Sequence, residues 1–229
     1  MKTVLVVQHT EAEYLGLIED HFEGRNIRFS YARPFAHGGG IPAERGSHDG
    51  LVLLGAGPYG LVSGHLLPSA MPEMRLTKAF LDAGLPVVGI ELGALILCAA
   101  AGGGADEAPL RLEIAEARRM SDDALGGHLP ARFPLACYLR DRPVLPPGAE
   151  VLAADDDGAP LVFSIGGRSL GFLGHPGTKS GMVEDLVMEF AETPPGTAEA
   201  LAALRGRQGE VAAALSDMMV GICRHTGLM

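Results

Sequence analysis

A chain of 229 residues, 47% of them hydrophobic, is long enough to form one α/β domain with a substantial core. Its formal net charge of −10 excludes the basic face that phosphate-driven binding of nucleic acid requires. Its three cysteines are too widely separated for a disulfide framework or a structural zinc site, and no segment has the apolar length of a membrane helix. Because the chain opens directly into a strand, without a signal peptide, we expect a cytoplasmic protein.

The first part of the chain alternates strands with helices. Apolar, β-branched runs predict buried strands at 4–8, 27–31, 49–54 and 87–90. Helical spacing of apolar residues predicts helices at 11–22, 71–83 and 92–101. For the first of these helices, Thr10 is the expected N-cap, and Glu11 and Glu13 favour the helix N-terminus. The alternation predicts a doubly wound, mostly parallel sheet with right-handed crossovers.

Two glycine-rich segments interrupt this pattern. Residues 33–46 contain His37 followed by three glycines; they could wrap a ligand, but a surface loop is the simpler interpretation. Gly55 and Gly57 follow the third strand directly. Glycines at that position bring backbone N–H groups to the edge of the sheet where α/β proteins bind ligands, although many such turns contain glycine.

The second part of the chain has shorter elements. Strands are predicted at 110–114, 135–139, 150–153, 161–165 and 170–173, with a hairpin at Gly166-Gly167. The acidic run 155–158 indicates a solvated turn, because its consecutive carboxylates lack the spacing of a calcium loop. Helices are predicted at 180–192 and at 197–224. We expect one main domain, 1–192, with a helical extension, 193–229, that packs on it; a dimer interface is the alternative role for this extension.

The segment Gly89-Ile90-Glu91-Leu92-Gly93 joins a buried strand to a helix. Its G-x-E-x-G spacing is that of a nucleophile elbow, a tight turn in which small flanking residues lift the central side chain above the sheet edge. An elbow usually carries Ser or Cys, and here the central residue is Glu91. The segment therefore predicts the geometry of a catalytic turn without its usual nucleophile.

An ordered set of landmarks resembles the class I glutamine amidotransferase (Triad) family, and in particular its stand-alone members, over about residues 2–190. The landmarks are Val4-Leu5-Val6-Val7-Gln8-His9, Leu53-Leu54-Gly55-Ala56-Gly57-Pro58, Pro86-Val87-Val88-Gly89-Ile90-Glu91-Leu92-Gly93, Cys98-Ala99-Ala100-Ala101-Gly102-Gly103, Leu145-Pro146-Pro147-Gly148-Ala149-Glu150-Val151-Leu152-Ala153 and Gly171-Phe172-Leu173-Gly174-His175-Pro176. The resemblance implies a flavodoxin-like, three-layer α/β fold with a doubly wound, mostly parallel sheet and an added small antiparallel segment.

The resemblance also implies which positions form the site. In active members a Cys attacks the amide of glutamine, a His acts as its base and a Glu orients the His. The matching positions here are Glu91, His175 and Gly177, so only the His is retained. Ligand-contacting positions correspond to Gly55, Gly57, Leu92 and Leu95, and Leu95 replaces a Gln that helps to hold the substrate. The H-x-x-D landmark keeps only Asp141.

These substitutions predict the loss of glutaminase activity, because a carboxylate is a poor nucleophile toward an amide. We favour a binding or partner subunit, working with a protein partner or a small-molecule ligand. The alternative is a repurposed enzyme in which Glu91 and His175 form an acid–base dyad for another small substrate.

Three other residues are weaker candidates for a nucleophile or a metal ligand. Cys98 lies about 10 Å along the helix from the turn, and Cys137 lies on a strand near the altered H-x-x-D landmark; both are expected to be buried core residues. His9 follows the first strand and could join Glu91 and His175 around a divalent ion, but such clusters also arise without metal. We therefore expect neither a metal nor a cofactor.

Overall fold

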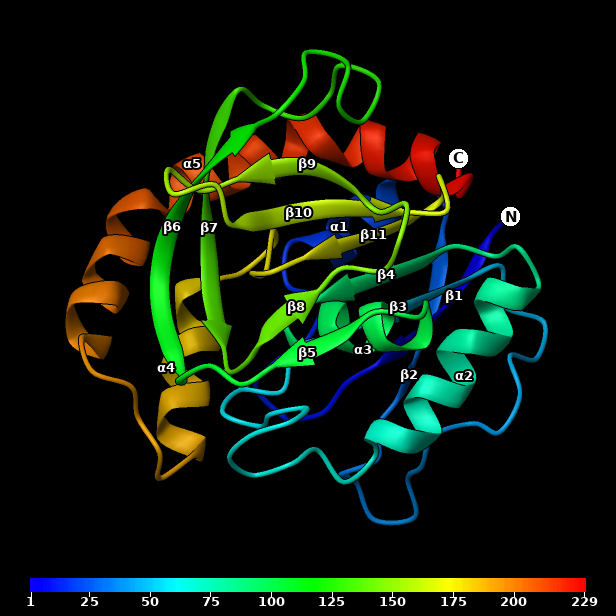
Figure 1. The fold of residues 1–229 in the computed structure, drawn as a ribbon, viewed down its shortest axis with the longest axis horizontal. Helices are drawn as coiled ribbons and strands as arrows, with labels where there is room; N and C mark the ends of the chain where they lie inside the picture. The colour runs from blue at the N-terminus through cyan, green and yellow to red at the C-terminus, as the bar shows by residue number, and fades with distance from the viewer.

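The computed structural model describes residues 1–229 and has a nine-stranded sheet at its centre, in the order β2-β1-β3-β4-β11-β10-β9-β6-β7 (Figure 1). The parallel half consists of β2 (Arg28–Ala32), β1 (Thr3–Val7), β3 (Gly50–Leu53), β4 (Val87–Ile90) and β11 (Ser169–Phe172). β1, β3 and β4 are buried almost throughout, as their continuous apolar runs predict. The predicted mostly parallel α/β sheet is confirmed.

The remaining strands are antiparallel and extend the same sheet beyond β11. They are β10 (Pro160–Ile165), β9 (Glu150–Ala154), β6 (Arg111–Arg119) and β7 (Arg132–Leu139). β10 and β11 form the expected hairpin, whose turn is Gly166-Gly167 with both residues at positive φ. A separate two-stranded antiparallel sheet pairs β5 (Gly104–Asp106) with β8 (Arg142–Val144). This two-stranded sheet is the small antiparallel segment that the sequence predicts in addition to the main sheet.

Five helices cover the sheet (Figure 1). α2 (Ala70–Asp82) and α3 (Leu92–Ala100) contact each other on one face, and α1 (Ile18–Gly24) and α5 (Thr197–Thr226) contact each other on the opposite face. α4 (Ser180–Glu189) packs against α5. The apolar residues of the C-terminal half of α5 belong to the main hydrophobic core of 49 buried residues, and Leu204 and Val211 nearer its start belong to a second cluster of eight.

The helix predicted at 11–22 is wrong over its first half, because α1 begins only at Ile18. Gly16 has a φ of 62° and lies so close to the carbonyl of Gly177 that a Cβ there would overlap with it. The N–H of Leu17 donates to that same carbonyl, at 2.8 Å. This close backbone contact prevents a continuous helix, and it leaves residues 10–17 as an irregular segment at the sheet edge.

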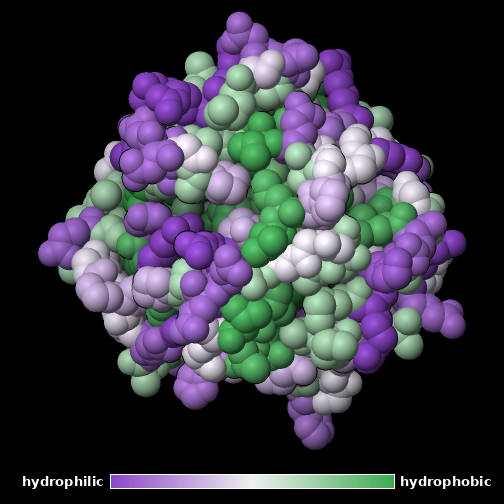
Figure 2. Space-filling view, in the orientation of Figure 1, coloured by the Kyte–Doolittle hydropathy of each residue, from purple (hydrophilic) through white to green (hydrophobic).

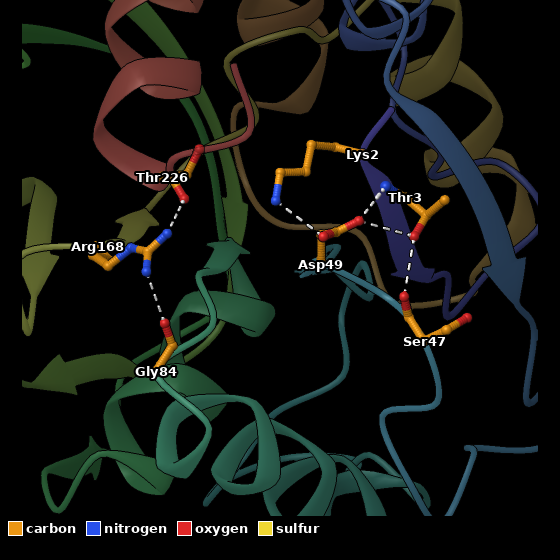
Figure 3. A network of polar contacts seen from close by, with 7 residues as sticks. All are labelled: Lys2, Thr3, Ser47, Asp49, Gly84, Arg168 and Thr226. Atoms are coloured by element: carbon orange, nitrogen blue, oxygen red, sulfur yellow. Dashed lines mark hydrogen bonds and ion pairs between the residues drawn. The ribbon is translucent and has the colours of Figure 1, made fainter.

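Polar contacts join the segments at the amino-terminal ends of the parallel strands, near both chain termini (Figure 3). The guanidinium of Arg168 donates to the carbonyls of Gly84 and Thr226, at 3.1 and 3.2 Å. Asp49 accepts from the N–H of Thr3 at 2.9 Å and from the ammonium of Lys2 at 3.0 Å. These contacts join the end of α5 to the start of β4, and the start of β1 to the start of β3.

Hydrophobic residues form a band down the middle of one face of the molecule, with hydrophilic residues on both sides of it (Figure 2). No helix combines the length and the apolar character that crossing a membrane would require.

Candidate functional site

A sharp turn connects β4 to α3 and places Glu91 between them. Glu91 has φ 52° and ψ −115°, a conformation that non-glycine residues rarely adopt and that costs about 1–3 kcal/mol. A Cβ at Gly89 would lie 2.5 Å from the carbonyl oxygen of Gly93 and 2.7 Å from the Cα of Ala94, so the turn closes only with glycine there. Steric exclusion of a Cβ therefore explains why the sequence pattern has glycine beside Glu91.

The carboxylate of Glu91 is buried, and the residue is only 3% exposed. Its Oε1 accepts a 2.8 Å hydrogen bond from the N–H of Tyr138, on β7. Burial, followed by the neighbouring Glu13 carboxylate, raises the pKa of Glu91 well above its usual range, and the Tyr138 N–H opposes this only in part. Burial also raises the pKa of the Tyr138 phenol, to about 12.

Glu13 is the second carboxylate of the site, and sequence reasoning assigned it only to a helix N-terminus. It is 1% exposed, and its Oε2 accepts a 3.1 Å hydrogen bond from the N–H of Gly57. The Thr10 hydroxyl accepts the N–H of Glu13 at 3.1 Å, which shapes the irregular segment rather than capping a helix. The predicted glycine-turn amide therefore binds a side chain of this chain.

The two carboxylates meet above Gly55. A Cβ added at Gly55 would overlap with Oε1 of Glu13 and with Oε2 of Glu91, which shows that both oxygens converge on one point. Two carboxylates in contact in a buried site cannot both be ionised without a large electrostatic cost. We therefore interpret Glu13 and Glu91 as an acid pair that holds one proton between its facing oxygens.

His175 is buried at 3% exposure, and both of its ring nitrogens bind the backbone. Nε2 lies 2.8 Å from the carbonyl oxygen of Tyr14 and must carry the proton, because a carbonyl only accepts; Nδ1 accepts the N–H of Gly177 at 3.1 Å. Burial lowers the pKa of His175, so the ring is neutral. No hydrogen bond joins His175 to Glu91, and the dyad predicted from the sequence stays a prediction without a direct contact.

The space above the turn is closed. Leu92 and Leu95 are 1% and 0% exposed, in keeping with their place on α3 inside the core. Glu91 and His175 are each only 3% exposed, so neither side chain opens to solvent. The structure brings Gly55, Gly57 and Glu91 together as the sequence pattern predicts, but Glu13 fills the space between them.

The rim of the site is also occupied by side chains. Arg140 donates from Nε to the carbonyl of Pro58 at 3.1 Å and forms an ion pair with Glu192. The buried carboxylate of Asp141 accepts the N–H groups of residues 61, 62 and 63, at 2.8 to 3.3 Å. The retained residue of the H-x-x-D landmark therefore anchors the loop after the glycine turn.

The other candidates form no hydrogen bond with Glu91 or with His175. Cys137 is fully buried, and burial raises the pKa of its thiol; the thiol pKa of Cys98 is raised to about 12 in the same way. His9 is bonded to Glu73 on α2, through Nε2 and Oε2 at 2.8 Å. No group of three or more His, Cys, Asp or Glu residues is placed to hold a metal ion.

Two residues of the site carried no clear sequence signal. The sequence did not indicate that Glu13 belongs to the site, because its segment has the apolar spacing of a helix. Only the glycine at position 16 argued against a helix there. Tyr138 contributes a backbone N–H, which any residue except proline would supply. Its hydroxyl is buried without a hydrogen-bond partner.

Comparison with known proteins relates this architecture to one group of enzymes. No family model matches the chain, and no curated protein does. Among solved structures, a glutamine amidotransferase from Methylobacillus flagellatus has a TM-score of 0.83 at 21% identity, over 99% of this chain and 96% of that one. A glutamine amidotransferase from Thermotoga maritima has a TM-score of 0.79 at 21% identity, over 98% of each chain.

A third structure, assigned as one subunit of a GMP synthase from Thermoplasma acidophilum, has a TM-score of 0.62 at 17% identity, over 92% of this chain and 98% of that one. At such identities the similarity concerns the backbone. The chain has the flavodoxin-like fold of the glutamine amidotransferases, and its structural neighbours include these enzymes over nearly their whole length.

Proposed function

We propose that this protein is a glutamine amidotransferase-like protein that has lost glutaminase activity and serves as a binding or partner subunit. The Glu13–Glu91 acid pair carries this proposal. It occupies the position where a nucleophile and a substrate amide would have to meet, and it uses the Gly57 N–H that would stabilise an oxyanion.

The remaining groups support the same conclusion. Catalysis by Cys and His requires a base within hydrogen-bond reach of the nucleophile and a third group that orients the base. Here His175 is fixed by Tyr14 and by Gly177 through the backbone alone. Neither ring nitrogen is left to accept a proton from residue 91, which also weakens the alternative of an acid–base dyad on another substrate.

The first experiment measures ammonia release from L-glutamine by the wild type and by Glu91→Cys. We expect both to stay at the background rate, because the variant restores a thiol but neither the base geometry nor a side chain that orients His175. Adding Glu13→Ala to Glu91→Cys empties the site and tests whether occlusion is the only obstacle. Turnover of glutamine by the wild type would overturn the proposal.

A role as one component of a complex is supported by the exposed apolar residues near the site. Of the nine large hydrophobic residues that are exposed, four lie between positions 35 and 71: Phe35, Val62, Leu66 and Met71. All four belong to loops, or to the first turn of a helix, that follow β2 and β3 at the carboxyl edge of the sheet. The structural neighbour assigned to a GMP synthase has the same fold.

The corresponding experiment purifies the protein from its own cells through a tag and measures which protein co-purifies in stoichiometric amount. We expect Leu66→Asp to abolish this association. Met188→Asp is the matched control, because Met188 is a 76% exposed apolar residue on α4. Equal loss in both variants, or no stoichiometric partner with either the wild type or the control, would count against the role in a complex.

A further inference from the structure

The strand order of the sheet reverses at β1, because β2 lies on one side of it and β3 on the other. The chain leaves β1 toward α1 and leaves β3 toward α2, and these two helices lie on opposite faces of the sheet. In doubly wound sheets this divergence opens a crevice beyond the carboxyl ends of the two strands, where ligands bind preferentially. A cavity of about 380 Å³ lies there, within the range of roughly 300–1,000 Å³ that small-molecule sites have.

No ionic side chain of this cavity is available to a ligand. Its ten lining residues include no Asp, Glu, Lys or Arg, although 20% of the chain is charged. His9 lines the cavity, but its ring nitrogens are already bonded to the Glu73 carboxylate at 2.8 Å and to the Gly55 carbonyl at 2.7 Å. A charged ligand would lose its hydration without gaining a counter-charge, so the cavity favours an uncharged molecule.

Aromatic and apolar side chains form the walls. The ring of Phe35 comes from the loop after β2, and the ring of Tyr59 comes from the loop after β3. The remaining apolar surface belongs to Pro34, Ile41, Leu67, Pro68 and Pro72. Two rings on different loops favour an aromatic guest, because ring–ring contacts add to the energy of apolar burial. Ser69 also lines the cavity, and its hydroxyl makes no capping bond to α2, which leaves it to bond a neutral polar group.

These walls are held in place by contacts within the protein. Tyr59 packs edge-on against Phe190, with ring centroids 5.8 Å apart and an interplanar angle of 89°. Backbone hydrogen bonds close the loop that carries Tyr59 and Leu67: the N–H of Gly60 donates to the carbonyl of His65 at 2.9 Å, and the N–H of Leu67 donates to the carbonyl of Gly60 at 3.0 Å. Proline fixes φ at three lining positions. A cavity formed in advance costs little conformational entropy to fill.

We propose that this cavity binds a small uncharged aromatic molecule, with its ring against Phe35 and Tyr59 and a neutral polar group, such as a hydroxyl, toward Ser69. Neither Glu13 nor Glu91 lines the cavity, so the proposal does not depend on the acid pair.

The first test uses isothermal titration calorimetry on the wild-type protein at neutral pH, with three probes that share one naphthalene ring. They are the uncharged 2-naphthalenemethanol, the anion naphthalene-2-carboxylate and the cation 2-naphthylmethylammonium. We expect a Kd on the order of 1 mM or tighter for the alcohol. Both ions should bind at least about tenfold more weakly, because neither finds a counter-charge. No binding of the alcohol, or an ion that binds as tightly as the alcohol, would overturn the proposal.

The preference for an aromatic ring is tested with decahydronaphthalene-2-methanol, the saturated relative of the alcohol. It is uncharged and has the same carbon skeleton, but it cannot make ring–ring contacts with Phe35 and Tyr59. It should therefore bind about two- to tenfold more weakly than the aromatic alcohol. Equal or tighter binding of the saturated alcohol would overturn the assignment of an aromatic ligand.

The location is tested by filling the cavity. Ile41→Trp places a bulky side chain in it and should weaken binding of the aromatic alcohol at least about tenfold. Val62→Trp is the matched control: it makes a similar change on an exposed residue that does not line the cavity, and it should leave the affinity unchanged. Unchanged affinity in Ile41→Trp, or equal loss in both variants, would overturn the site.

A measurement on the wild type removes any dependence on how a variant folds. In spectra of methyl-labelled protein, the aromatic alcohol should shift the methyl signals of Ile41 and Leu67 in a saturable way. Leu85, which lines a different cavity, should not shift. No saturable shift at Ile41 and Leu67 would refute the proposal, whatever the glutaminase assay shows.

Discussion

Two polar pairs lie near the carboxyl edge of the same sheet, and they differ in charge. Glu13 and Glu91 bring two like charges together in a closed space, where a shared proton is the way to avoid their repulsion. His9 and Glu73 bring opposite charges together, and both side chains are fully buried. The comparison indicates that the two pairs are equally buried and differ in how their charge is balanced: by a shared proton in the acid pair, and by a counter-charge at His9 and Glu73.

Gly55 stands between the two pairs and touches both. Its carbonyl accepts from His9 at 2.7 Å, and its Cα faces the carboxylates of Glu13 and Glu91. One residue thus places the end of β3 against both sites. We expect perturbations of the two pairs to be separable unless they pass through Gly55, and the following predictions address this in order of expected effect.

The largest effect is expected from His9→Leu. It leaves the Glu73 carboxylate buried without a counter-charge, which should lower the free energy of unfolding by about 3–5 kcal/mol. The double variant His9→Leu/Glu73→Leu removes both charges. It should recover most of this loss and keep a cost of about 1–3 kcal/mol, because the Gly55 carbonyl loses its donor. Urea unfolding measures both, and a double variant as unstable as the single one would contradict the charge argument.

Gly55→Ala should destabilise the protein by about 1–3 kcal/mol, because the new methyl group overlaps with the carboxylates of Glu13 and Glu91. Gly181→Ala is the control; it lies in α4 with no atom within 4 Å of its added Cβ, and it should not destabilise. Combining Gly55→Ala with Glu13→Ala should remove much of the cost. Additive losses in that double variant would show that the methyl group clashes elsewhere.

The pH dependence of Glu91→Gln tests the acid pair directly. Because the pKa of Glu91 is raised in the folded state, the folded protein binds more protons than the unfolded one above the ordinary value of 4.5. This contribution to stability is fully present below that pH and is lost as the pH rises toward the folded pKa. The wild type should lose up to about 1.4 kcal/mol per pH unit in this window, and Glu91→Gln should remove that slope.

Glu11→Gln serves as the comparison for this measurement, because Glu11 is an exposed carboxylate in the same segment. Its pH profile should follow the wild type. Identical slopes for the wild type and Glu91→Gln between about pH 5 and about pH 8 would mean that the two carboxylates do not share a proton.

The smallest effect is expected at the rim. Glu192→Gln removes the ion pair with Arg140, and the Glu192 side chain is 45% exposed. Because solvent screens such pairs, the free energy of unfolding should fall by less than about 1 kcal/mol. The pH slope due to Glu91 should not change. A larger loss would mean that the rim, rather than the acid pair, keeps the site closed.

The parallel strands were predictable because their side chains are buried on both faces. β1, β3 and β4 are short apolar runs bounded by polar or glycine residues, so hydrophobic burial alone determines where they lie. The glycines at 89 and 93 predicted the sharp turn at Glu91, because the backbone around that turn leaves no room for a Cβ at either position. Both are properties of a few consecutive residues.

The irregular segment 10–17 could not be predicted in this way. Its apolar residues have helical spacing, but its conformation is set by contacts with Gly177 and His175, more than 150 positions later in the chain. The small sheet of β5 and β8 is similar, because three-residue strands carry too little pattern and form only where two distant loops meet. Here tertiary contact overrides local propensity.

The sequence by itself determined the fold, through its buried strands and the glycines of its turns, and it identified Glu91 as the unusual residue of the site. Only the tertiary structure decided what Glu91 faces. It places Glu13, from a segment that looked helical, against Glu91, and it turns both nitrogens of His175 toward the backbone. The physical reason is that burial and hydrogen bonding depend on neighbours distant in sequence, whereas strand formation depends on the chain's own local pattern.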